Sequence, residues 1–453
     1  MDWRPSVDDG RRLRLGYGLN LHAPRTVQEL LHGLRTVTLP LRERVAPGAR
    51  FGVGMYLPAE LAHALDPGAD AFGRSRSADT PSAASSATSV RPDDGLAELE
   101  RFLAEHALDP FTFNAFPYGG FQTDGLKERV FAPAWWERAR FDYTLAVARC
   151  ALRLVRAAPG ARSHVSISTH CGQFGALDVD GARELAAIAH LARCALEFAR
   201  LEDATGVRIV LALEPEPRSS CNDLASLARF LPRVRERGAR FLVREHGVAS
   251  ARADALLARH LGVCLDACHA AVEFEDAASV GAGVGALGKL QFTSALAVRD
   301  PSGNERGRAA LLALDEPRFL HQVTGRRGAE LLRARDLGEV AAAMERWLAC
   351  DEWRCHFHVP VDLDLARDER GAPLGLTTTR AFADAVLGRV LGAPFADELH
   401  ELHLEIETYT WDVLPAFARA GGGGAERLVE GLEREYAHVA GVLARAGWTR
   451  ATA

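Results

Sequence analysis

The chain alternates short apolar runs with longer stretches in which apolar residues recur every three or four positions. The first pattern predicts buried β-strands, and the second predicts amphipathic α-helices that cover them. Nine runs are strand candidates: residues 15–21, 51–57, 111–116, 164–169, 207–214, 262–266, 289–296, 355–361 and 402–408. Helices are predicted at residues 26–44, 96–106, 134–156, 182–203, 223–245, 336–350 and 381–391. Strands that alternate with helices along a whole chain predict a parallel sheet.

A length of 453 residues suits one large (β/α)8 TIM barrel with surface insertions, and we predict an α/β protein with a single domain over residues 1–453. A closed barrel needs eight strands, so either one candidate lies outside it or the architecture carries an extra strand. The weakest candidates are the glycine-containing 15–21 and 355–361, which could pair in an excursion outside the barrel. Residues 72–95 are rich in Ser, Ala and Pro and predict a disordered insertion. A run of glycines at 421–424 separates a final amphipathic helix at residues 425–447.

Four strand candidates end with side chains that can bind a divalent metal. The segments are VRIVLALE (207–214), GVCLDACH (262–269), RCHFHVP (354–360) and LHLEIET (402–408). Carboxylates and imidazoles are costly to bury unless they are paired, hydrogen-bonded or bound to metal. The C-terminal ends of barrel strands are also where such barrels build their active sites. This pattern is the main reason to expect an enzyme.

Glu214, Asp266 and His269 are the first candidate ligands. Glu214 directly follows an apolar strand, which favours a metal-binding and catalytic carboxylate over a loop acid outside the barrel mouth. Asp266 closes its strand, and His269 comes three residues later. A turn there could direct both side chains at one ion, or leave His269 to a second ion or to the substrate. The alternative is an N-capping aspartate beside a core histidine.

Two later strands add same-side pairs. His356 and His358 alternate on an apolar strand, as do Glu405 and Glu407. Paired imidazoles are uncommon for simple packing, and paired glutamates need cations or donors nearby. We expect His358 to be a metal ligand and Glu407 to be both a ligand and a catalytic group, since Glu407 is nearer the end of its strand.

Substrate-binding candidates are weaker. Asn114 and His22 lie at strand ends, and Tyr118 belongs to the loop FPYGGF, which either faces a ligand or packs on the barrel. Gln291 on the strand KLQFTSAL could offer its amide oxygen to a metal, but hydrogen bonding to substrate is at least as consistent with glutamine chemistry. His321 in FLHQV is either a further ligand or an ordinary buried histidine.

Composition narrows the class of protein. A hydrophobic fraction of 48% with 25% charged residues is typical of a globular protein, and the net charge of −6 gives no global basic field for nucleic acid. The first residues contain no apolar signal region, and no run approaches the ~18 apolar residues of a membrane span. We therefore expect a cytoplasmic location and no membrane span. The eight cysteines include no C-x-x-C pair, so we expect reduced thiols rather than a zinc ribbon.

Taken together, the metal-binding strand ends resemble the xylose isomerase-like TIM-barrel superfamily, which includes sugar isomerases, epimerases and endonuclease IV-type phosphodiesterases. The closer resemblance is to the EboE family of metabolite traffic proteins. It is carried by NLHAPRT, FTFNAFPYGGF, SISTH, LEPEP, GVCLDACHAAVEFE, KLQFTSAL, FLHQV, WRCHFHVP and LHLEIETYTWDVLP. The resemblance implies a metal-dependent barrel encoded in a bacterial secondary-metabolite gene cluster, with a small metabolite and other proteins of that cluster as partners. Epimerases of the superfamily carry a histidine where this chain has Gln291, so His358 or His321 could replace that ligand.

Three functions are consistent with these residues. The first is an isomerase or epimerase of a polyol-like metabolite, with one Mn, Mg or Zn ion held by Glu214, Asp266, Glu407 and either Gln291 or His358. The second is hydrolysis of a phosphoester by two or three zinc ions, for which further histidines would be needed. The third is a barrel that binds a metabolite and hands it on without turnover.

Overall fold

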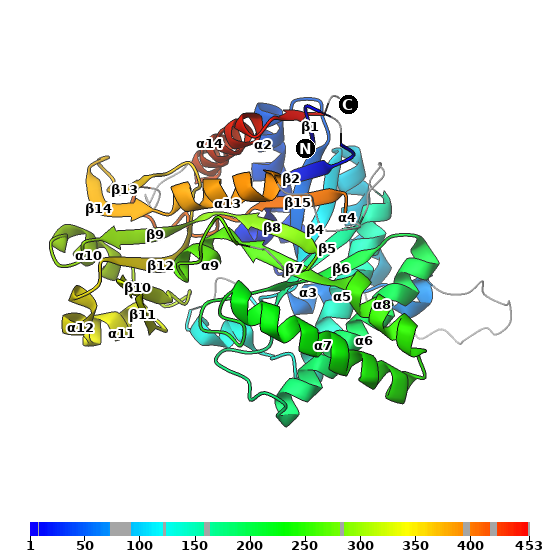
Figure 1. Ribbon diagram of the computed structural model, residues 1–453. Coiled ribbons are helices and arrows are strands. Elements are labelled where there is room, and N and C mark those ends of the chain that lie inside the picture. The colour runs from blue at the N-terminus through cyan, green and yellow to red at the C-terminus, as the bar shows by residue number, and fades with distance from the viewer. Residues whose placement is uncertain are drawn as a thin grey trace, which may run out of the picture.

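Eight parallel strands close into a barrel in the computed structural model, which describes residues 1–7, 9–72, 92–120, 124–157, 164–280, 285–392, 399–416 and 424–451. The strands are β2 (Arg12–Gly18), β3 (Phe51–Tyr56), β4 (Leu108–Asn114), β5 (Val165–His170), β6 (Ile209–Glu214), β7 (Leu261–Asp266), β8 (Leu287–Phe292) and β15 (Glu401–Ile406). Each strand pairs in parallel with the next, and β15 pairs with β2 to close the ring (Figure 1). The predicted α/β class and (β/α)8 barrel are confirmed.

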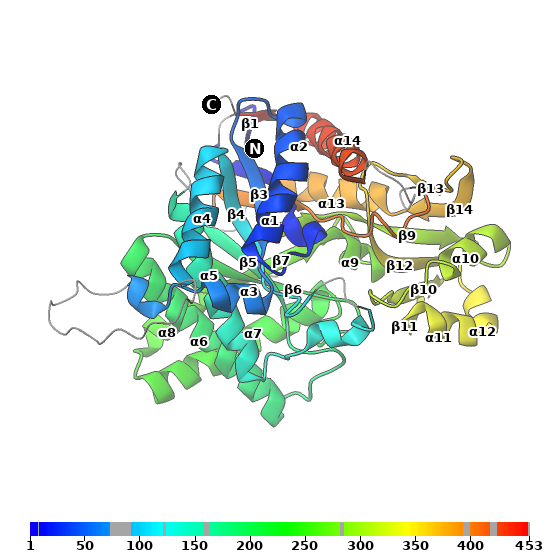
Figure 2. The ribbon, with the colours of Figure 1, turned by 180° about the vertical axis from the view of Figure 1, so that it is seen from behind.

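Helices surround the barrel on its outside (Figures 1 and 2). They are α1 (Val27–Gly33), α2 (Leu39–Val45), α3 (Ala59–Leu65), α4 (Pro92–Glu105), α5 (Arg138–Ala157), α6 (Ala182–Thr205), α7 (Leu224–His246), α8 (Ser250–His260), α9 (Ala267–Val272), α13 (Arg380–Gly392) and α14 (Gly424–Arg445). Two short strands, β1 (Asp2–Pro5) and β16 (Trp448–Arg450), extend the sheet beyond β2. Helix α14 occupies nearly the range predicted for the final helix. Most of the predicted insertion at 72–95 lies outside the described residues.

A second sheet is inserted between β8 and β15 and lies beside the barrel (Figures 1 and 2). Its strands are β9 (Ser294–Arg299), β10 (Val323–Arg327), β11 (Glu330–Ala334), β12 (Glu352–Val359), β13 (Leu365–Arg367) and β14 (Pro373–Thr378), with helices α10 (Glu305–Leu312), α11 (Leu337–Ala342) and α12 (Met344–Leu348). It is antiparallel, in the order β11-β10-β12-β9-β14-β13, and has its own apolar cluster. Candidate strand 355–361 belongs to β12, so it is the one that lies outside the barrel, whereas 15–21 contributes to β2.

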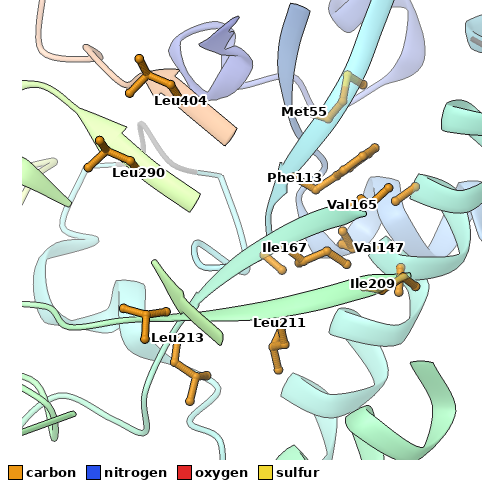
Figure 3. Close-up of a cluster of buried hydrophobic side chains, with 14 of the residues drawn as sticks. Met55, Phe113, Val147, Val165, Ile167, Ile209, Leu211, Leu213, Leu290 and Leu404 are labelled. Atoms are coloured by element: carbon orange, nitrogen blue, oxygen red, sulfur yellow. The ribbon is translucent and has the colours of Figure 1, made fainter. Parts of the chain in front are cut away.

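Successive side chains on the barrel strands point alternately outward, to the apolar core under the helices, and inward, to the interior of the barrel. On β6, Ile209, Leu211 and Leu213 belong to the main apolar cluster, and Figure 3 shows them with Val165 and Ile167 of β5. On β5, Ser166 lies between these two apolar residues and Ser168 follows Ile167, and both serines face the other side because successive side chains on a strand point to opposite faces. The apolar faces therefore pack between the strands and the helices.

The interior of the barrel is polar and charged, whereas barrels of this type are commonly filled with branched apolar residues. Lys289 Nζ lies 2.6 Å from Glu405 Oε2 and 3.1 Å from Ser168 Oγ, and all three side chains are buried. Gly54 makes room for Glu405, since a Cβ at position 54 would lie 1.5 Å from Glu405 Oε1. The ion pair between Lys289 and Glu405 therefore fills the barrel near the C-terminal ends of its strands.

Two further expectations concern the chain as a whole. All eight cysteines are free and buried, as expected from their spacing. Within the described ranges, no helix has the length and apolar character needed to cross a bilayer.

Candidate metal centre

Seven buried acidic and imidazole side chains meet at the C-terminal mouth of the barrel. They are Glu214, Glu216, Asp266, His269, His356, His358 and Glu407. Within this set, three groups have ligand atoms within 4.8 Å of one another: Glu214–Asp266–Glu407, Asp266–His269–His358 and Glu216–His269–His356. The five metal ligands predicted from the sequence therefore lie together, joined by Glu216 and His356.

Two parts of the fold supply these side chains. Glu214 and Asp266 end β6 and β7, Glu407 directly follows β15, and His269 lies in the first turn of α9. Asp266 also caps that helix, because its Oδ1 accepts a hydrogen bond from the backbone N–H of His269 at 2.9 Å. His356 and His358 come from β12 of the inserted sheet. The inserted sheet therefore completes a site that the barrel begins.

Three imidazole nitrogens converge on one point. The Nε2 atom of His269 lies 3.1 Å from that of His356 and 3.3 Å from that of His358, and the last two are 2.8 Å apart. Each ring presents its Nδ1 to an oxygen that can only accept a hydrogen bond. These oxygens are Pro215 O for His269 (3.0 Å), Gln322 Oε1 for His356 (2.6 Å) and Glu407 O for His358 (2.9 Å). The proton of each neutral ring therefore belongs on Nδ1, and three Nε2 lone pairs face one another.

This arrangement fits a bound cation. Burial lowers the pKa of His269 to about 3 and that of His358 to about 4, and it holds the pKa of His356 well below its usual range. The rings are therefore neutral at pH 7, and their facing lone pairs repel unless a positive ion lies between them. Ligands around tetrahedral zinc, at bonds of about 2.0–2.1 Å, stand about 3.3 Å apart, close to the observed spacings.

The carboxylates lead to the same conclusion. Burial, with the carboxylate of Asp266 nearby, raises the pKa of Glu214 to about 8, and burial also raises the pKa of Asp266. Burial and neighbouring glutamates hold the pKa values of Glu216 and Glu407 well above the usual range. Among the described residues, Glu214 Oε2 and Asp266 Oδ2 are buried without a hydrogen-bond partner. Buried acceptors of this kind call for a cation or a proton.

Asn20 and Asn114 orient Glu407. Their Nδ2 atoms donate to Glu407 Oε1 at 2.9 and 3.1 Å, respectively. Both amides also line the pocket above the cluster. Asn114 therefore lies in the site, as expected, and it contacts a candidate ligand directly.

Two other candidates, Gln291 and Tyr118, have different surroundings. Gln291 is buried inside the barrel, where its Oε1 accepts from Cys264 Sγ at 2.8 Å, and it does not line the pocket. Tyr118 packs edge-on against Tyr143, with 5.2 Å between ring centroids, and is also absent from the pocket lining. These positions do not bring either side chain to the mouth of the barrel.

Two histidines are also turned away from the cluster. His22 Nε2 lies 3.1 Å from the hydroxyl of Tyr17, and the ring borders a separate surface hollow. His321 stacks on Phe357 with 4.0 Å between centroids and places Nε2 3.3 Å from Glu316. Of the possible replacements for Gln291, His358 is therefore the one that joins the ligand cluster.

A pocket that is partly open to solvent lies directly above the ligands. Gln322 and Tyr409 line it, and neither was anticipated from the sequence. A polar side chain next to His321 in an otherwise apolar segment was the only signal for Gln322.

The cations at the pocket rim are balanced by acids. Lys127 Nζ lies 2.8 Å from Asp336 and 3.2 Å from Asp315. Arg318 lies 2.7 Å from Glu316 and 2.6 Å from Asp412. The rim therefore has no excess of positive charge of the kind that binds a polyanion.

Comparisons with known proteins add little beyond the fold. No family model matches the sequence, and no curated protein matches it. Among solved structures, the chain is similar to an IOLI protein with a bound zinc atom, with a TM-score of 0.41 and 10% identity over 96% of this chain and 99% of that one. It is also similar to an AP endonuclease of family 2 from Brucella melitensis, with a TM-score of 0.31 and 16% identity over 61% and 78% of the two chains. These values are too low to support an argument about activity, and the barrel assignment rests on the strand order of this chain.

Proposed function

We propose that the chain is a metal-dependent hydrolase that holds at least two divalent ions and acts on a small-molecule phosphoester. The observation that carries the proposal is the convergence of three imidazole Nε2 atoms beside a separate group of carboxylates. Seven ligand side chains are more than one catalytic ion can use, because such an ion typically takes three protein ligands and keeps a position open. Sites with two metals are common in phosphatases and nucleases.

The residues divide naturally between two ions. His269, His356 and His358, with Glu216 beside them, would hold one, and Glu214, Asp266 and Glu407 would hold the other. Ions bound here would supply Lewis-acid polarisation of a phosphoryl oxygen and lower the pKa of water. The hydrogen bonds from Asn20 and Asn114 keep the Glu407 carboxylate in one orientation.

Zinc suits the donor set. Imidazole nitrogens favour zinc and its neighbours over magnesium. We therefore propose zinc at least for the imidazole group.

A small substrate is favoured over nucleic acid. The chain carries a net charge of −6, and the rim cations Lys127 and Arg318 are each paired with two acids. Binding of a nucleic-acid backbone depends on neutralising many phosphates with free basic groups.

A sugar isomerase or epimerase is the second candidate. It is favoured by Glu214 and Glu407, which both line the pocket and have raised pKa values, as groups that carry protons to and from carbon do. It needs only the ion held by Glu214, Asp266 and Glu407. The role implied by the EboE resemblance, a metabolite traffic protein that hands on its ligand without turnover, is a third proposal.

Metal content and product analysis distinguish these proposals. Elemental analysis of protein loaded with zinc and then desalted should give at least two ions per chain. His358→Ala should lose one ion, and the exposed His63→Ala should lose none. Release of phosphate or alcohol from a panel of small phosphoesters would support hydrolysis, whereas isomerised sugars and a single ion would favour the second candidate. Ligand binding without product would favour hand-over, and a protein that retains no metal would contradict both catalytic proposals.

A further inference from the structure

The pocket above the metal centre has two chemically different parts. Its floor consists of the candidate ligands and the amides of Asn20 and Asn114. Its walls are mainly apolar side chains from three segments that are far apart in the sequence. These are Phe116, Pro117, Leu126 and Val130 after β4, Phe319 and Leu320 before β10, and Tyr409 after β15.

The first wall is held in place by buried contacts. The guanidinium of Arg140, fully buried, donates from Nη1 to the carbonyls of Ala115 (2.9 Å) and Phe116 (2.6 Å). The ring of Phe116 packs against Phe131, with 5.1 Å between centroids, and Phe131 in turn packs against Phe174 at 5.3 Å. An apolar surface built in this way does not reorganise readily to offer hydrogen bonds.

A second part of the wall, formed by Phe319 and Tyr409, is joined to the metal floor. Tyr409 stacks on His358 at 4.4 Å between centroids, and Phe319 packs on Tyr409 at 5.5 Å. The backbone N–H of Phe319 donates to Glu316 Oε1 at 2.6 Å, which fixes the start of this segment. An aromatic row therefore leads from the rim down to one of the three converging imidazoles.

A polyol would be a poor occupant of these walls. Each hydroxyl placed against them would give up its hydrogen bonds to water without replacement, which disfavours binding. An apolar group would instead leave water for a surface that matches it. Away from the floor, the polar lining residues are Gln322, Thr410 and the rim cations Lys127 and Arg318. Each rim cation is already paired with two acids, so the floor is where an oxyanion would meet the metal ions.

From this division we infer that the substrate is an ester with an oxyanionic head and an apolar body, rather than a sugar phosphate. The inference rests on the proposed hydrolase function and specifies the class of its substrate. The head lies at the imidazole and carboxylate ligands, and the body lies between Phe116 and Val130 on one side and Phe319 and Tyr409 on the other.

The test is calorimetric binding of non-hydrolysable phosphonates to zinc-loaded protein. Methylphosphonate reports on the head alone, and butylphosphonate and its dihydroxybutyl analogue share a head and a chain length but differ in polarity. We expect butylphosphonate to bind about tenfold more tightly than either of the others. Val130→Thr, which changes polarity with little change in volume, should reduce that preference by about threefold. The matched control Val179→Thr, at an exposed position, should leave it unchanged.

Two results would overturn the inference in different ways. Equal or tighter binding of the dihydroxybutyl analogue, with zinc content unchanged, would refute the apolar body and leave the hydrolase proposal intact. Failure of all three phosphonates to bind a sample that retains its zinc would refute the phosphoester head, and the proposed function with it. Phe319→Leu keeps the wall apolar and should preserve the preference for butylphosphonate. A preference lost only in Val130→Thr would then be due to the added polarity and not to substitution of the wall as such.

Discussion

Zinc binding to this site should release protons, and the contribution of Glu214 can be worked out from its surroundings. Burial beside Asp266 raises the pKa of Glu214 from its ordinary 4.5 to about 8. At pH 7, about 0.9 of the Glu214 carboxyl groups are then protonated in the metal-free protein, and at pH 8.5 about 0.2. Because a metal ligand must be deprotonated, these protons leave when zinc binds.

The other ligands determine the sign of the total effect. The pKa values of Glu216 and Glu407 are also raised, so their protons add to the release. His269 and His358, with pKa values of about 3 and 4, are already neutral at pH 7 and contribute almost nothing. Zinc affinity should therefore increase with pH through neutrality, and the part of this increase that comes from Glu214 should level off as the pH passes about 8.

Calorimetry in buffers of different ionisation enthalpy measures this release directly. Glu214→Gln should bind zinc with about 0.9 fewer protons released at pH 7 and with a smaller difference at pH 8.5. Glu435→Gln is the matched control. Burial raises the pKa of Glu435 to about 8 as well, but its Oε1 accepts from Thr408 Oγ1 at 2.6 Å and from the N–H of Val361 at 3.1 Å, outside the ligand cluster. If Glu214→Gln retained zinc and released as many protons as the unmodified protein, the assignment of Glu214 as a ligand would be wrong.

Three further substitutions test the supporting structure. Lys289→Met leaves Glu405 buried without its partner at 2.6 Å and should lower the free energy of unfolding by about 3–5 kcal/mol, measured by chemical denaturation. Gly54→Ala forces a Cβ to within 1.5 Å of Glu405 Oε1 and should cost at least about 1–3 kcal/mol in the same assay. Asn20→Leu removes one of the two amide hydrogen bonds to Glu407 and should weaken zinc binding by about 10–100-fold, measured by competition with a chelator, while the unfolding midpoint of the metal-free protein changes little.

The barrel was predictable because its strands carry a strong local signal. In runs such as residues 207–214, apolar side chains of both parities are followed by an acid, as is typical of a strand buried on both faces that ends at a site. The same reasoning placed Glu214, Asp266 and Glu407 at one rim, because parallel strands in a closed barrel share one C-terminal end. Those three residues do lie within 4.8 Å of one another.

Loop positions were less predictable, since a strand pattern does not determine the direction of the chain beyond the strand. After β2 the chain enters a 3-10 turn, Leu19–His22, and Ala23 adopts a left-handed conformation with φ of 41°. That turn leaves Asn20 facing Glu407 and directs His22 toward Tyr17 instead. Tyr118 lies four residues beyond β4 and packs on Tyr143. We expected His22 and Tyr118 in the site because each lies near a strand end, but the chain after each strand directs both side chains elsewhere.

The number of candidate metal ligands was the hardest feature to predict, because two of them, His356 and His358, lie on the inserted sheet. Parity along β12 correctly puts His356 and His358 on one side, but parity says nothing about where that strand lies relative to the barrel. The antiparallel pairing of β12 with β9, which continues from β8, turns both imidazoles toward His269. The barrel alone would present the carboxylates and His269, and the inserted strand adds His356 and His358, which make the proposed second ion possible. The difference between a one-metal and a two-metal site therefore resides in an insertion whose position depends on long-range pairing.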